Sequence, residues 1–250
     1  MFYFFMAPIL TYNWLLILAA IVPAIFLMVK VYRSDRLEPE RPSTLWYMVK
    51  GGFWAAIWAG VVEGIAISVL NQVVPDKKSL LYNVIMYFGI VAFAEEGLKY
   101  FFLKRRSWNS EEFNCQYDGV VYATFVALGF ALFENVSYVM YYGFTTALVR
   151  AVTAIPGHAC FGVFMGIFYG LARGHSYLEH NFRSKLCRIL AVVIPAFIHG
   201  SYDFTASMNS AEGQWIFLIF IVVLFCISFL LVHHMSKNDH YFQMVRRRYR

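Results

Sequence analysis

The chain of 250 residues is dominated by apolar side chains, with 60% of residues hydrophobic, 19% aromatic and only 14% charged. A soluble domain normally carries about 25% charged residues, so this composition excludes an ordinary water-soluble fold. We therefore expect an all-α polytopic membrane helix bundle that forms a single integral-membrane domain over residues 1–250, with no separate soluble domain.

Seven apolar segments are long enough to cross a hydrocarbon core about 30 Å thick as helices. In chain order they are Pro8–Val29, Gly52–Val74, Leu80–Leu103, Tyr117–Tyr142, Thr146–Ala172, Leu186–Met208 and Gln214–Val232. The first is too long for the apolar part of a signal peptide and has no basic region before it, which predicts a retained helix. The prolines of the loop Asp35–Pro42 predict a break before the second segment.

Positive charges are divided unequally between the two ends of these segments. All but three of the 21 Lys and Arg residues lie on one side, and the exceptions are Lys77, Lys78 and Arg150. The positive-inside rule then predicts an amino terminus outside and a carboxyl terminus in the cytoplasm. The net charge of +6 is thus a topology signal. It could also draw the basic tail to anionic lipid, and it gives no reason to invoke nucleic acid.

The third segment carries adjacent carboxylates and a lysine in Ala94-Glu95-Glu96-Gly97-Leu98-Lys99. A charge at the bilayer centre costs roughly 2.5–3.5 kcal/mol on insertion scales, so such residues usually serve a function. On a helix Glu95 and Glu96 both lie near Lys99, because positions three or four apart share a face. The alternative is an interfacial ion pair in which the lysine extends its ammonium group to water.

The next three segments hold further polar residues at membrane depth, which are Glu134, Asn135, His158, His199 and Asp203. Any one of them could make a hydrogen bond that packs two helices together. Together they predict a shared polar site inside the bundle, since isolated groups would each need a separate partner. Glu63 and Arg150 are two more unusual ionisable residues, to which the pattern assigns no role.

His158 begins a stripe of small residues, with Gly162, Gly166 and Gly170 following at intervals of four. Such a face lets another helix approach closely, so His158 is expected to face protein rather than lipid.

Carboxylates and histidines at this depth could activate water. In an adjacent carboxylate pair, repulsion between like charges lets one member hold a proton that the other cannot, which suits a general base and acid. The histidines and Asn135 could orient water or stabilise an oxyanion. Alternatively, His158, His199 and a carboxylate could hold a metal ion such as zinc, although no H-E-x-x-H is present. The four cysteines stand singly without C-x-x-C spacing, which argues against disulfides and structural zinc.

Five motifs stand in order over about residues 35–205, and they are Glu38-Pro39-Glu40, Ala94–Lys99, Gly129–Asn135 with Tyr138, Arg150 with His158-Ala159 and Gly166, and His199–Phe204. They resemble the motifs of the PrsW family of intramembrane proteases, which is distantly related to the CAAX-processing and bacteriocin-immunity membrane proteases. Arg41 departs from the family pattern, in which an acidic or polar residue often follows such a loop motif.

The resemblance implies an endopeptidase of the bacterial cell membrane that cuts a single-pass membrane protein, such as an anti-sigma factor. Its essential groups map onto Glu95, Glu96 and a motif histidine. We interpret one of the two glutamates as the general base and the other as the group that tunes it. His158 and His199 would polarise the carbonyl group or bind water. The groups that would orient them are Glu134, Asn135 and Asp203. The family has been called both a metalloprotease and a glutamate protease, and the adjacent carboxylates slightly favour the latter.

Two functions of other classes fit the same residues. A proton- or cation-coupled transporter also uses buried Glu, His and Asp. The chain nevertheless shows no internal repeat and no paired interrupted helices in matching halves. A catalytically inactive scaffold would instead bind membrane helices through the glycine face.

Overall fold

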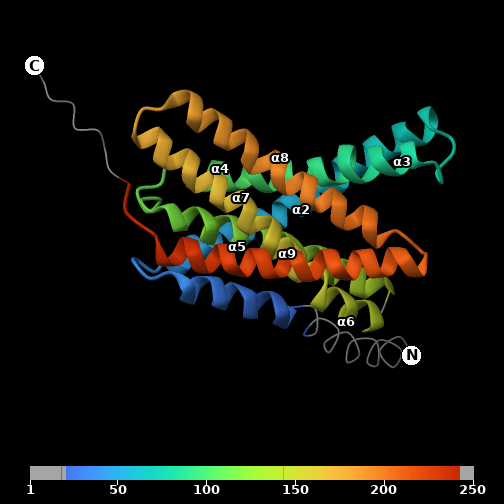
Figure 1. Ribbon diagram of the computed structural model, residues 1–250, viewed down its shortest axis with the longest axis horizontal. Helices are drawn as coiled ribbons and strands as arrows, with labels where there is room; N and C mark the ends of the chain where they lie inside the picture. The colour runs from blue at the N-terminus through green and yellow to red at the C-terminus, as the bar shows by residue number, and fades with distance from the viewer. Residues whose placement is uncertain (1–17, 19–20, 143, 243–250) are drawn as a thin grey trace, which may run out of the picture.

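The computed structural model describes residues 18, 21–142 and 144–242, which form a bundle of long helices running along one axis (Figure 1). Within these ranges there is no β-sheet, and a single isolated bridge joins Cys115 to Tyr241. In the described part of the chain six helical spans are long and apolar enough to cross a membrane, which confirms the all-α polytopic bundle.

The helices match most of the predicted segments. A helical stretch over residues 21–34 is followed by α2 Pro42–Val73, α3 Leu80–Val84, the π-helical η1 Ile85–Ala92, α4 Phe93–Ser107, α5 Gln116–Tyr142, α6 Phe144–Val152, α7 Ala154–Tyr177, α8 Asn181–Ala206 and α9 Ala211–Lys237. Most of the predicted first span, and the basic end of the tail at residues 243–250, lie outside the described residues.

One predicted boundary was wrong, and one predicted span is interrupted within its length. The second helix begins at Pro42 rather than Gly52, because proline is favoured in the first turn of a helix and the polar residues after it continue the same helix. The predicted segment Thr146–Ala172 is divided at Thr153 into α6 and α7. Pro156 explains this division, since it has no N–H to donate to the carbonyl oxygen of Val152, four residues earlier.

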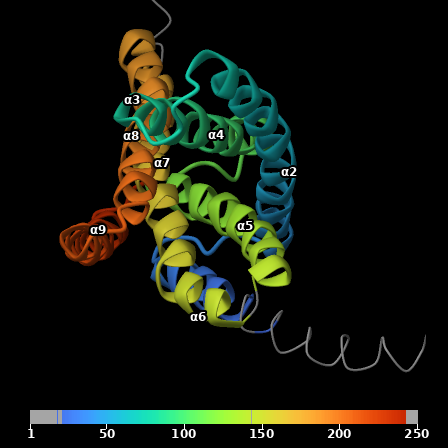
Figure 2. The same cartoon turned by 90° about the vertical axis from the view of Figure 1, so that its right-hand side faces the viewer.

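Helix α5 forms the centre of the bundle and lies between α2 and α7 when the molecule is seen end-on (Figure 2). In its most apolar stretch 78% of the residues are buried, against 17% for α9 at the periphery. The contact between α5 and α7 depends on the predicted glycine face. A Cβ atom on Gly166 would lie 2.4 Å from the Cα of Val120, so only glycine permits this approach. His158 is buried at the far end of the same face, as predicted.

The π-helical segment η1 leads directly into the turn that carries Glu95 and Glu96. π-Helical turns are rare and occur frequently at functional sites. Helix α8 packs closely on η1 at Gly200, where a Cβ atom would lie 2.6 Å from Cδ1 of Phe88. This close approach brings the neighbouring residue, His199, against the start of α4.

Candidate active site

Lys99 lies at the centre of a buried polar cluster. Its side chain is fully buried, and its Nζ donates to Glu95 Oε2 at 3.0 Å and to Glu96 Oε1 at 2.8 Å. The same Nζ lies 3.1 Å from His158 Nδ1 and 3.9 Å from the centroid of the Phe130 ring. The alternative in which Lys99 reaches water is therefore wrong.

His158 is held from its other side by Glu134 of α5. Its Nε2 lies 2.8 Å from Glu134 Oε2, and Arg150 Nη2 lies 2.9 Å from the same oxygen. Arg150 Nε also donates to Asn135 Oδ1 at 2.9 Å. The short helix α6 thus supplies a cation that fixes two polar residues of α5, a role that the sequence pattern did not reveal.

His199 makes the corresponding contacts from α8. Its Nδ1 lies 2.9 Å from Glu96 Oε1, and its Nε2 lies 3.4 Å from Asp203 Oδ2, one turn along the helix. The imidazole stacks on Phe161, with ring centroids 4.6 Å apart and an angle of 21° between the ring planes. The two imidazole rings, of His158 and His199, have centroids 5.4 Å apart.

The polar residues singled out in the sequence therefore meet in one place, as the hypothesis of a shared polar site predicts. Helices α4, α5, α7 and α8 supply them, and Glu63 of α2 lies close enough to interact electrostatically with Glu134, His199 and Lys99. Glu95, Glu96 and both histidines are buried, whereas the side chains of Glu134 and Asp203 are 22% and 23% exposed. The cluster is therefore more open on the side of these two carboxylates.

Helical spacing in the sequence placed Lys99 beside both glutamates, but Lys99 was not counted among the predicted site residues. An ammonium group three residues from one carboxylate and four from the other can bridge the two on a single helical face.

Three of these residues could also hold a metal ion, since ligand atoms of Glu95, Glu96 and His158 lie within 4.8 Å of one another. Carboxylate and imidazole groups are common zinc ligands. All three residues, however, contact the ammonium group of Lys99 at 2.8–3.1 Å. A metal ion held by the three would have to displace Lys99. His199, which the sequence hypothesis placed among the ligands, instead contacts Glu96.

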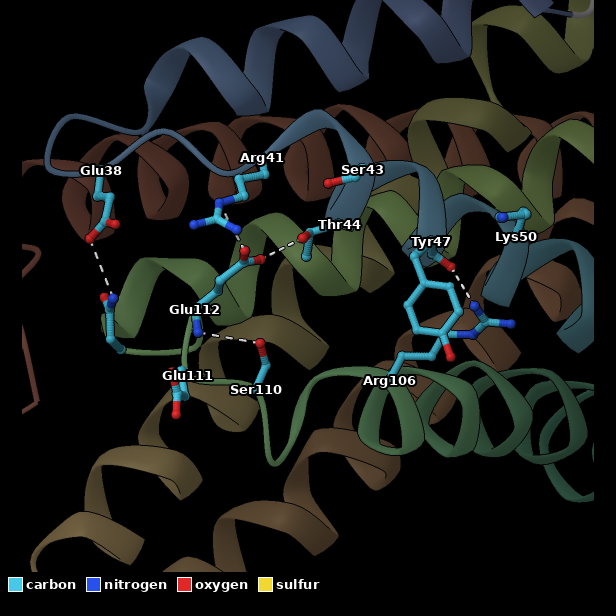
Figure 3. Close-up of a pocket in the computed structure, with 11 residues that line it drawn as sticks. Glu38, Arg41, Ser43, Thr44, Tyr47, Lys50, Arg106, Ser110, Glu111 and Glu112 are labelled. Atoms are coloured by element: carbon cyan, nitrogen blue, oxygen red, sulfur yellow. Dashed lines mark hydrogen bonds and ion pairs between the residues drawn. The ribbon is translucent and has the colours of Figure 1, made fainter.

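A cavity of about 780 Å³ lies apart from this cluster at one end of the bundle, and Figure 3 shows the residues that line it. It is polar, and it includes Glu38 of the loop motif, which accepts a hydrogen bond from Asn114. Glu112 forms an ion pair with Arg41 and accepts a hydrogen bond from Thr44. These contacts fasten the first loop to the connection between α4 and α5. Next to the cavity, burial raises the pKa of Glu40 to about 7.

Membrane-spanning helices around a buried cluster of glutamates, histidines and a lysine define an integral membrane protein with a polar site inside its helix bundle. The chain matches the model of the PrsW family, described as "PrsW family intramembrane metalloprotease", over residues 40–232. It therefore belongs to the PrsW family, and it is a membrane peptidase that acts on membrane-embedded substrates.

Relatives named Protease PrsW cover most of the chain. The protein of Bacillus subtilis (strain 168) is 32% identical over 210 residues, which are 84% of this chain and 89% of the relative. That of Oceanobacillus iheyensis (strain HTE831) is 30% identical over 221 residues, covering 88% and 95% of the two chains. That of Clostridioides difficile (strain 630) is 26% identical over 219 residues, covering 85% and 88%. No solved structure matches the chain.

Proposed function

We propose that this intramembrane protease hydrolyses a peptide bond with a water molecule activated by glutamate, and that Glu96 is the general base. The observation that carries the proposal is the state of its two carboxylate oxygens. Oε1 is held by Lys99 and His199, whereas Oε2 is buried and has no hydrogen-bond partner among the described residues. A general base needs a lone pair free to accept a proton from water, and Oε2 supplies one.

The neighbouring groups have distinct roles in this mechanism. The ammonium group of Lys99 is only a donor, so His158 Nδ1 accepts from it and Nε2 carries the proton donated to Glu134. His158 is thus a neutral positioning group. His199 has a carboxylate beside each ring nitrogen, so an N–H on either side has an acceptor. We assign His199 as the group that returns a proton to the leaving amine.

The reaction follows from these roles. Glu96 takes a proton from water as the water oxygen attacks the carbonyl carbon, which produces a tetrahedral oxyanion. Lys99 supplies the nearest positive charge to stabilise the oxyanion, because a preorganised cation in a dry site is effective against developing negative charge. The C–N bond then breaks as the amine nitrogen receives a proton from His199, and Glu96 passes its proton back to His199.

A metal ion does not fit this arrangement as it stands. The donor set of Glu95, Glu96 and His158 suits zinc, but the space between the three is filled by the Lys99 ammonium group. The mechanism above therefore uses only the side chains of the chain. Purified protein carrying about one zinc ion per chain, with the zinc lost in His158→Ala or His199→Ala, would overturn it.

The substrate we propose is a single-pass membrane protein such as an anti-sigma factor of the bacterial cell membrane. This rests on the resemblance of the five motifs to the PrsW family. The proposed orientation places the amino terminus outside the cell, as the distribution of basic residues predicts. A reporter that functions only in the cytoplasm should be active when fused after Arg250. An active exported reporter at the same position would contradict this orientation.

The test is cleavage of a membrane substrate by purified Glu95→Gln and Glu96→Gln. Glu96→Gln should lower the cleavage rate on the order of 100-fold or more, because an amide cannot accept the proton of water. Glu212→Gln, an exposed glutamate at the start of α9, is the matched control and should cleave normally. Comparing the membrane proteins of cells that carry Glu96→Gln or the unaltered chain would identify the substrate.

The same variants separate the proposal from its rivals. A transporter predicts uptake of solute into liposomes without any cleavage product, whereas a scaffold predicts that Glu96→Gln keeps full function. Complete cleavage by Glu96→Gln would refute the assignment of Glu96 as the base, and complete cleavage by both glutamine variants would refute any glutamate base at this site.

A further inference from the structure

A second cavity, of about 520 Å³, lies between the helical residues 21–34, α7 and α9. In Figure 1 the helix of residues 21–34 (blue) runs beside α9 (red-orange). Its walls are mainly apolar and include Phe26, Val31, Val163, Phe225, Phe229 and Val232. Phe26 and Phe229 are 65% and 58% exposed, so these walls open onto the surface that the membrane covers. We call this cavity the α7–α9 groove.

One end of the α7–α9 groove is basic. Lys30, Arg33 and Arg36 line it from the first helix and the residues just beyond, and His233 lines it from α9. The ammonium group of Lys30 lies 5.2 Å from the centroid of the Phe229 ring. No carboxylate in the described part of the chain forms an ion pair with any of the four.

The basic end is also the end at which the two helices are joined. Ser236 of α9 donates a hydrogen bond to the carbonyl oxygen of Ser34. From Phe225 to Ser236 the groove extends about 16 Å along α9, given a rise of 1.5 Å per residue. This is about half the thickness of the hydrocarbon core, so the groove is too short for a helix that crosses the membrane.

We propose that the α7–α9 groove binds an anionic glycerophospholipid. The phosphate would lie among Lys30, Arg33, Arg36 and His233, and an acyl chain would lie along the apolar walls. Charge complementarity supports this occupant, because basic pockets between membrane helices attract anionic headgroups. The apolar remainder of the groove, which faces the hydrocarbon core, matches an acyl chain and disfavours a soluble anion. The lipid would hold the first helix against α7, whose residues Ala159 and Cys160 line the groove beside His158.

The test uses the full chain reconstituted in phosphatidylcholine nanodiscs with or without phosphatidylglycerol, followed by native mass spectrometry of retained lipid. The unaltered chain should retain phosphatidylglycerol in preference to phosphatidylcholine. The variant Lys30→Gln/Arg33→Gln/Arg36→Gln should weaken retention on the order of 100-fold, since each basic group contributes about a fivefold factor. The control Arg183→Gln/Lys185→Gln removes exposed charges at the start of α8, outside the groove, and should retain the lipid.

A thermal unfolding measurement in phosphatidylcholine alone distinguishes loss of binding from loss of fold. The triple variant should unfold at the same temperature as the unaltered chain there, and it should lack only the increase that phosphatidylglycerol produces. Equal retention of both lipids by the unaltered chain, or undiminished retention of phosphatidylglycerol by the triple variant, would overturn the proposal. Neither outcome depends on whether the peptidase mechanism above is correct.

Discussion

Replacing Lys99 with methionine tests how the buried cluster is held together. Methionine keeps much of the volume of the side chain but removes the charge, which leaves Glu95 and Glu96 adjacent and buried without their shared cation. Removing one partner of a buried ion pair costs about 3–5 kcal/mol, because the remaining charge is left uncompensated. For a chain of this size that cost corresponds to a melting temperature lower by roughly 6–20 °C.

The chain offers a convenient assay for this prediction. Cys115 and Cys160 are free and buried, whereas Cys187 is half-buried and Cys226 is exposed. With Cys187 and Cys226 replaced by serine in every variant, a thiol-reactive fluorophore reports unfolding as the temperature rises. Lys104→Met is the control, because Lys104 is an exposed residue of the same helix and its loss should change stability by less than about 0.5 kcal/mol.

A double variant makes the test specific to charge. Adding Glu95→Gln to Lys99→Met removes the second uncompensated carboxylate and should restore roughly 1–3 kcal/mol, which a double-mutant cycle measures as a coupling energy. Our account of the cluster is refuted if Lys99→Met melts with the unaltered chain, or if Glu95→Gln lowers the stability of Lys99→Met still further.

Two further predictions concern packing and pH. Gly166→Ala should destabilise the protein by about 1–3 kcal/mol or more, because its Cβ atom would meet the backbone of α5. The control Gly60→Ala has open space around it and should be neutral or slightly stabilising. Equal melting temperatures of the two variants would argue against the close contact of α5 and α7. Burial raises the pKa of Asp35 from 3.8 to about 6, so the folded state binds a proton on this carboxylate more tightly than the unfolded state does. The contribution of Asp35 to the free energy of unfolding therefore falls as the pH rises from about 4 to about 6. Above pH 6 Asp35→Asn should therefore be more stable than the unaltered chain by about 1–2 kcal/mol after allowance for solvent screening, and this difference should vanish near pH 4. A difference in melting temperature that does not change with pH would contradict this prediction.

Much of the fold could be predicted because each membrane helix must satisfy its own backbone groups, and length and apolarity then define the spans. The division at Thr153 was missed because a membrane helix often continues through a proline, so Pro156 alone did not predict a break. The π-helical segment before Glu95 leaves no signal in the apolar pattern either.

The membership of the candidate site followed from the cost of charge in lipid, which singled out Glu95, Glu96, His158 and His199 individually. Their arrangement could not be predicted, because it depends on tilts and close approaches such as that of Gly200 to Phe88. Lys99 was underestimated for a related reason. A lysine near a helix end usually extends to water, and only the surrounding helices prevent it here.

The position of the buried charges has a consequence for biogenesis. The span Leu80–Ser107 has a mean hydropathy of 1.2, the lowest of the six described candidate spans, whereas that of α9 is 3.2. Lys99 offsets only one of the two glutamate charges within that span, and the imidazoles that complete the cluster belong to α7 and α8, which the ribosome makes later. A nascent chain that has reached only α4 thus carries a span that lipid accepts poorly. We therefore expect α7 and α8 to stabilise α4 in the membrane, which would couple the folding of this protein to the later stages of its synthesis.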